Sequence, residues 1–256
     1  AEQALPVGER ALDLLVALLS ETGQHVAAAD RLLDDVDALS AADRAYRQWR
    51  AAELLAQPEP ARALTLFAEA AVRIDDPALV EAWSGLARSE GEPSMLFAAL
   101  EAQIRQSAGD GPEAMRRSRY QLEASQLASS SLDDWAAARA LCEQSLASWP
   151  DNVDALVHLG SILEHLGDDE ALAANWTHQL DALLPGRHRS RLAGRLVGLL
   201  EELGVPEGKI APYRSIMAEI DVDEHVEVEV LPAPPEPSAG RPRALAEKSN
   251  ESIVTS

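Results

Sequence analysis

Apolar residues recur with a helical period along most of the chain, and helix-breaking residues interrupt the pattern at regular intervals. The six breaks lie at Gly23, Gln57-Pro58, Gly91, the serine run 129–131, Gly167 and Gly204. A glycine at such a place is typical of a helix C-terminal cap, and the residue before a proline disfavours helix. Because the breaks are 34 to 38 residues apart, the pattern predicts about six units of similar length.

Each unit carries one apolar stripe before its break and another after it, with the spacing of a helical face. The stripe predicted for the first helices is Leu12, Leu15, Leu18, Tyr46, Trp49, Ala52, Val80, Trp83, Leu86, Leu156, Leu159, Ile162, Ala193, Leu196 and Leu199. The stripe predicted for the second helices is Leu32, Val36, Leu66, Ala70, Leu100, Ile104, Trp176, Leu180, Tyr213 and Met217. The fourth unit fits less well, and its turn is about two residues longer.

A single hairpin cannot bury both of its apolar stripes, whereas stacked neighbours can. The sequence therefore predicts an all-α protein, a right-handed α-solenoid of about six helix-turn-helix repeats over residues 1–220. Residues 221–231 form an acidic segment whose VEVEVL alternation is consistent with a short strand. Residues 232–256 begin with a proline-rich stretch and are expected to be a disordered tail or linker.

The composition and net charge of the chain limit the classes of molecule that it can bind. The net charge of −21 argues against nucleic acid and anionic membranes, which require a basic face. The apolar runs are too short to insert directly into a bilayer, and no leader peptide is visible, so we expect a cytoplasmic protein. The chain begins at Ala1 and not at methionine, which indicates a processed or truncated chain. Its 20 arginines against two lysines favour a bacterial source with a GC-rich genome.

The sequence offers little catalytic chemistry. It contains no phosphate-binding or nucleophile-elbow motif and no metal-ligand spacing, so we expect no enzyme activity, no cofactor and no metal. His158 and His165 are two helical turns apart, too far to share one ion. The single cysteine, Cys142, lies on an apolar helix face and is expected in the core.

The repeat pattern resembles the tetratricopeptide repeat. The residues that carry this resemblance are Leu156, Leu159, Gly160, Leu163, Gly167, Trp176 and Pro185, with Trp83, Gly91 and Leu100 in the third unit. The resemblance covers roughly residues 6–219. The small residue usual on the second helix is replaced by leucine at positions 96 and 172, so other two-helix solenoids stay open. The resemblance implies that a protein or peptide binds on the concave surface lined by the first helices, without catalysis.

In this family, residues 13, 10 and 6 positions before the turn glycine face that surface, and counted from Gly91 they include Glu81 and Gly85. From these positions and an adjacent basic run we predict a ligand-binding groove of Arg44, Arg47, Arg117, Tyr120, Arg191 and Arg195. The arginines would bind the carboxylates of an acidic segment, and the small residues at the last position would leave room for it. Alternatively, the arginines pair with acidic ends of neighbouring repeats, and the small residues let helices approach.

Two functions from different classes follow from these patterns. The first is a non-enzymatic scaffold that binds a protein or peptide segment in its concave face. The alternative is a structural oligomerisation module of a larger bacterial assembly, which self-associates end to end or through the 226–231 strand.

Overall fold

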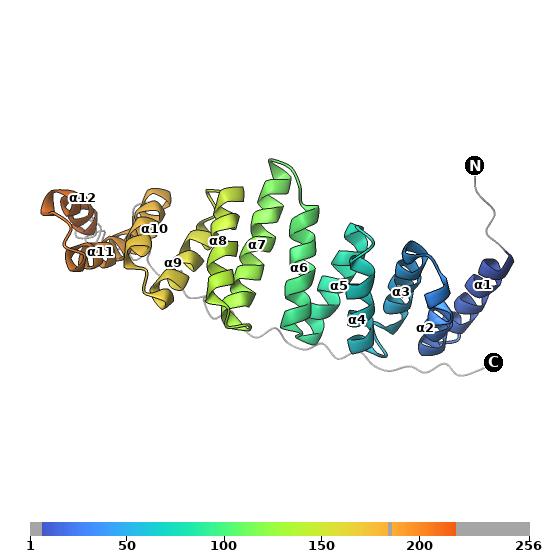
Figure 1. Ribbon diagram of the computed structural model, residues 1–256. Coiled ribbons are helices and arrows are strands. Elements are labelled where there is room, and N and C mark those ends of the chain that lie inside the picture. The colour runs from blue at the N-terminus through green and yellow to red at the C-terminus, as the bar shows by residue number, and fades with distance from the viewer. Residues whose placement is uncertain (1–6, 184–185, 219–256) are drawn as a thin grey trace, which may run out of the picture. The chain divides into compact units, whose positions relative to one another are not determined.

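The computed structural model describes residues 7–183 and 186–218. Within these ranges the chain forms twelve α-helices and one short 3-10 helix, and no strand. The helices are α1 (Val7–Glu21), α2 (His25–Leu33), η1 (Val36–Ala38), α3 (Ala41–Leu55), α4 (Pro60–Ala71), α5 (Pro77–Glu90), α6 (Pro93–Gln106), α7 (Pro112–Ser130), α8 (Trp135–Ser148), α9 (Val153–Leu166), α10 (Asp169–Ala182), α11 (Arg187–Glu202) and α12 (Glu207–Ala218). They pair into six hairpins in chain order (Figure 1).

The helices begin where proline or a short polar side chain satisfies the first turn. Four helices have proline within their first two positions, where its missing N–H is not needed; these are α4, α5, α6 and α7. Five helices, of which α5 also belongs to the first group, have a side-chain cap whose oxygen accepts a hydrogen bond from a backbone N–H of the first turn. The capping residues are Ser40, Asp76, Asp134, Asn152 and Asp168.

Five of the six predicted breaks fall in turns, whereas the serine run 129–131 covers the last two residues of α7 and the first residue of the turn that follows. Gly91 and Gly167 adopt left-handed φ angles of 69° and 67°, as the C-terminal cap of a helix requires. The turn of the fourth hairpin spans residues 131–134, against residues 91 and 92 in the third. Its extra length of two residues confirms the prediction.

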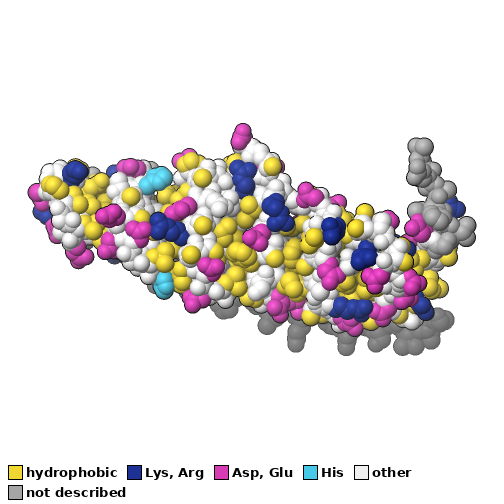
Figure 2. Space-filling model, in the orientation of Figure 1, with side chains coloured by type: hydrophobic (Ala, Val, Ile, Leu, Met, Phe, Trp, Pro, Cys, Tyr) yellow, Lys and Arg dark blue, Asp and Glu magenta, His cyan; other side chains and the backbone are white. Residues whose placement is uncertain are grey.

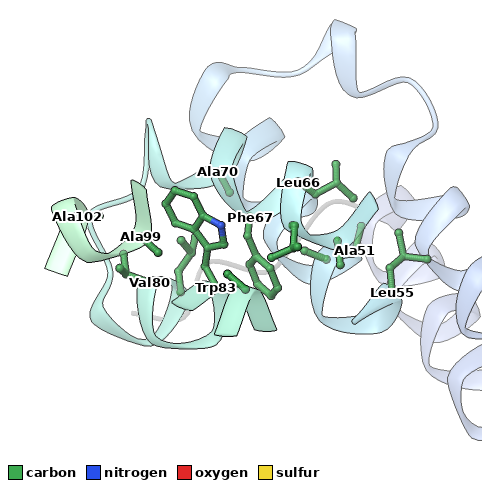
Figure 3. Packing of buried hydrophobic residues seen from close by; sticks show 14 of the residues in the cluster. Ala51, Leu55, Leu66, Phe67, Ala70, Val80, Trp83, Ala99 and Ala102 are labelled. Carbon is green, nitrogen blue, oxygen red and sulfur yellow. The ribbon is translucent and has the colours of Figure 1, made fainter. Parts of the chain in front are cut away.

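Every helix packs against its neighbours in sequence, with further contacts between next neighbours such as α4 with α6 and α7 with α9. The six described hairpins therefore form the predicted all-α solenoid. Their buried apolar residues make two clusters, one from α1 to α7 and one from α7 to α11, and Phe97 of α6 packs against both. Figure 3 shows the first cluster, in which Phe67 of α4 and Trp83 of α5 both lie in the interior.

The predicted stripes are buried in the middle hairpins, but not throughout. Leu15 and Leu18 of α1 and Met217 of α12 are exposed, because no further described hairpin covers either end of the array. Tyr46 is also exposed, beside a cavity between α1 and α3. The prediction that these four residues are buried was wrong.

The second helix of the first hairpin is shorter than its stripe predicted. α2 ends at Leu33, and Val36 opens the separate 3-10 helix η1. Asp34 is extended and Asp35 has a left-handed φ of 57°. Two carboxylates at a helix C-terminus face the negative end of the helix dipole, which explains why the helix stops there.

The acidic segment 221–231, with its predicted strand, and the proline-rich segment 232–256 lie outside the described residues. Among residues 7–183 and 186–218, no helix combines the length and the apolar character that crossing a bilayer requires.

Candidate functional site

A cavity of about 550 Å³ lies between the first helices of the third and fourth hairpins. We call it the α5–α7 groove. Its lining residues are Pro77, Glu81, Ser84, Gly85, Arg88, Gln103, Gln106, Ser107, Glu113, Arg116 and Tyr120. Three of them, Glu81, Gly85 and Tyr120, occupy positions that the repeat spacing assigned to the concave face.

The groove is lined by one face of each of three helices, α5, α6 and α7. Glu81, Gly85 and Arg88 recur at helical spacing along α5, so their side-chain positions line one wall. The opposite wall is lined by Glu113, Arg116 and Tyr120, which recur at helical spacing along α7. The C-terminal end of α6 supplies the amides Gln103 and Gln106 between these walls. The result is a polar cavity whose walls are two first helices.

The two arginines of the groove are neutralised by glutamates. Arg88 of α5 reaches across to Glu123 of α7 at 2.6 Å, and Arg116 pairs with Glu113 at 3.2 Å. Figure 2 likewise shows basic and acidic side chains interspersed over one face of the molecule, without a continuous basic stripe on that face. The groove therefore offers hydrogen-bonding groups without an excess of positive charge.

The side-chain amides of Gln103 and Gln106 already make some hydrogen bonds within the protein. Nε2 of Gln103 donates to Ser84 Oγ at 3.1 Å, and Nε2 of Gln106 donates to Asp75 Oδ1 at 2.8 Å. Oε1 of Gln103 is buried and has no hydrogen-bond partner among the described residues. Gln103 thus retains an unused acceptor beside the cavity.

Gly85 leaves open space in the groove, and the packing of the helices does not require a glycine at this position. A Cβ at this position would meet no atom within 4 Å. Gly160 of α9 is different, because its Cβ would lie 3.1 Å from Gln179 Nε2 and 3.2 Å from Asn175 Oδ1. Glycine inside a helix costs about 1 kcal/mol relative to alanine. At Gly85 no intramolecular contact offsets this cost.

We therefore expect the Gly85→Ala variant to be about 1 kcal/mol more stable than the wild type, because alanine favours helix and nothing obstructs its methyl group. Urea unfolding followed by circular dichroism measures the difference. Gly91→Ala is the control, and it should lose stability because φ at Gly91 is 69°. A loss of stability in Gly85→Ala would show that the helix needs a glycine at this point.

Three of the predicted arginines are held by the chain itself. Arg44 donates to the backbone oxygens of Val36 and Asp37 at 3.1 and 3.2 Å, and so supports the loop around η1. Arg117 donates to the oxygens of Ser107 and Gly109 at 2.7 and 3.1 Å, which supports the α6–α7 loop. Arg195 pairs with Glu164 and lies over the Trp176 ring, with its guanidinium carbon 4.5 Å from the ring centroid.

The other predicted residues lie in three places. Tyr120 lines the α5–α7 groove. Arg47 lines a smaller cavity of about 270 Å³ between α1 and α3, and its side chain makes no ion pair within the described part of the chain. Arg191 is exposed on α11. The structure thus brings Tyr120 together with Glu81 and Gly85, and it does not gather the five arginines into one groove.

No protein-family model matches the chain, and no curated protein matches it in sequence. Two solved structures are similar to it at low identity. One concerns pilF of Pseudomonas aeruginosa, 14% identical, covering 82% of this chain and 86% of that one, with a TM-score of 0.37. The other is BtubC from P. vanneervenii, 16% identical, covering 93% and 99%, with a TM-score of 0.39. Both likenesses are too distant to carry a functional argument.

The described hairpins form a tetratricopeptide-like α-solenoid. Arginine has a recurrent role in it, because it links equivalent helices of adjacent hairpins. The pairs are Arg50–Asp13, Arg62–Asp30, Arg88–Glu123, Arg139–Asp168 and Arg195–Glu164. Each is at least partly exposed and contributes at most about 1 kcal/mol. These contacts follow the alternative interpretation of the arginines, in which they pair with acidic residues of neighbouring repeats.

Cys142 and His158 are titratable side chains whose surroundings indicate a role in packing. Cys142 is fully buried and its Sγ lies 3.1 Å from the oxygen of Ala155, and burial raises the pKa of the thiol to about 12. A thiol with such a pKa is a poor nucleophile at neutral pH. Burial also lowers the pKa of His158, whose Nε2 has no partner among the described residues. Both side chains belong to the packing of α8 and α9.

Proposed function

We propose that the chain is a non-enzymatic scaffold that holds an extended segment of a partner protein in the α5–α7 groove. The observation that carries the proposal is a cavity of about 550 Å³ at the predicted concave positions, left open by a glycine that the helix itself does not need. A segment in this place would run between the walls of α5 and α7.

The lining indicates the kind of segment. The amides of Gln103 and Gln106 and the hydroxyl of Tyr120 offer hydrogen bonds to a peptide backbone or to polar side chains. The groove arginines are already paired with glutamates, so a polar segment without strong net charge fits best. Binding of an acidic segment stays a prediction at Arg47 and Arg191, because these two side chains have no ion-pair partner in the described ranges.

The proposal is tested by filling the groove. Gly85→Trp places an indole in the cavity, and Gly198→Trp is the matched control, since Gly198 also lies inside a first helix with open space around it. Wild-type and variant chains are used as bait in a lysate of the source organism, and their folding is compared by circular dichroism. We expect wild type and Gly198→Trp to retain the same protein and Gly85→Trp to lose it. Equal retention by both tryptophan variants would contradict binding in this groove.

A further inference from the structure

The outer face of α1 is apolar and uncovered. Leu14 and Leu18, one turn apart, are 73% and 59% exposed, and Ala11, Leu15 and Ala17 are exposed beside them. The opposite face of the helix is packed, with Val16 in the first core cluster. Terminal repeats of solenoids usually carry a polar outer face, because an apolar one would be left in water. This face of α1 therefore has the character of an interface.

Two opposite charges bracket the apolar face. Arg10 precedes it and Glu21 follows it, both exposed. Eleven residues separate them, which is about three helical turns and about 16 Å, so they lie on the same side of the helix as Leu14. Neither side chain makes an ion pair within the described residues. The charges are thus available to a partner.

This arrangement is complementary to itself when two copies of α1 pair in antiparallel orientation. A twofold axis midway along the helix places Arg10 of each copy beside Glu21 of the other, and Leu14 of each beside Ala17 and Leu18 of the other. Parallel pairing would place arginine against arginine and glutamate against glutamate. An isologous contact of this kind closes after two copies.

We propose that the exposed face of α1 is a homodimer interface, occupied by α1 of a second copy in antiparallel orientation. Burial of the leucines provides the attraction, and the two Arg10–Glu21 pairs fix the direction. A contact between two helices of 15 residues is smaller than a standard protein interface, so we expect a reversible dimer that depends on protein concentration. This interface is independent of the α5–α7 groove.

Sedimentation equilibrium of the full 256-residue chain over a range of concentrations tests the proposal. We expect a monomer–dimer equilibrium for the wild type and a Kd increased at least tenfold in Arg10→Glu and in Glu21→Arg, because symmetry places each like-charge pair twice. Mixing these two variants should restore the dimer, since each end then pairs a glutamate with an arginine. Their folding is checked by circular dichroism.

The leucines are tested separately. Leu14→Glu should abolish the dimer, whereas Val72→Glu, at a 75% exposed valine after α4, should leave it unchanged. A monomeric wild type at the highest concentrations would overturn the proposal and indicate that another protein or another segment covers this face. A dimer that survives Leu14→Glu, species larger than a dimer, or a mixture of the charge variants that stays monomeric would also overturn it.

Discussion

The Phe67→Ala variant is expected to lose about 3–5 kcal/mol of unfolding free energy, the largest loss that we predict for a single substitution. Phe67 is 1% exposed and lies in the first core cluster, where α4 meets α5 (Figure 3). Removing its ring leaves a cavity in this cluster, and helices held on both sides cannot collapse fully into it. Urea unfolding followed by circular dichroism measures the loss.

Val72→Ala is the control for this experiment, because Val72 is exposed at the end of the same helix. A surface change of this kind should alter the free energy by less than about 0.5 kcal/mol. If Phe67→Ala lost less than about 1 kcal/mol, the interior between the second and third hairpins would not be packed as described. Hydrogen exchange would show whether the loss is confined to these hairpins, as expected for a repeat array.

Replacing Asn152 by alanine should cost about 2–4 kcal/mol. Asn152 is 4% exposed, and its one side chain performs two tasks. Oδ1 caps α9 by accepting from the N–H of Ala155 at 3.2 Å, while Nδ2 donates to Ser118 Oγ of α7 at 2.9 Å. The substitution removes the cap and also takes a partner from a buried hydroxyl. The same urea unfolding measurement gives the value.

Ser40→Ala provides the comparison, because Ser40 caps α3 through Asp43 N–H but is exposed. It should cost only about 1 kcal/mol, the value of a cap alone. Asn152→Asp keeps a capping oxygen but removes the Nδ2 donor to Ser118, so its loss should fall between those of wild type and Asn152→Ala. Equal losses in Asn152→Ala and Ser40→Ala would mean that the link to Ser118 contributes nothing.

Asn152 also shows why the fourth repeat fitted poorly at the level of sequence. The buried stripe of α7 includes Ser118, Gln121 and Ser125, which hydrogen-bond to residues of α8, and Ser118 also accepts from Asn152. A search for apolar residues at helical spacing finds only an interrupted stripe there, because several buried positions of α7 are polar and hydrogen-bonded. The break positions still located the hairpin, since glycine and serine turns depend only on local backbone preferences.

The groove could be predicted in part. Counting back from the turn placed Glu81, Gly85 and Tyr120 on the concave face, because helical spacing fixes which side of α5 and α7 a residue occupies. Whether an arginine is free could not be predicted, because that depends on the distance to another hairpin. Arg88 and Arg195 both pair across such a junction. Leu15 and Leu18 of α1 were predicted as core for a similar reason, since periodicity does not reveal which of the described hairpins is packed on one side only.

The contacts between neighbouring helices also determine how the molecule can be assembled during synthesis. Among the described helices, packing mainly joins adjacent or next-adjacent ones, and an array of such local contacts has low contact order and folds quickly. Each hairpin emerging from the ribosome finds the preceding one already complete, and no helix must wait for a distant stretch of polypeptide. Translation can therefore build the array one hairpin at a time.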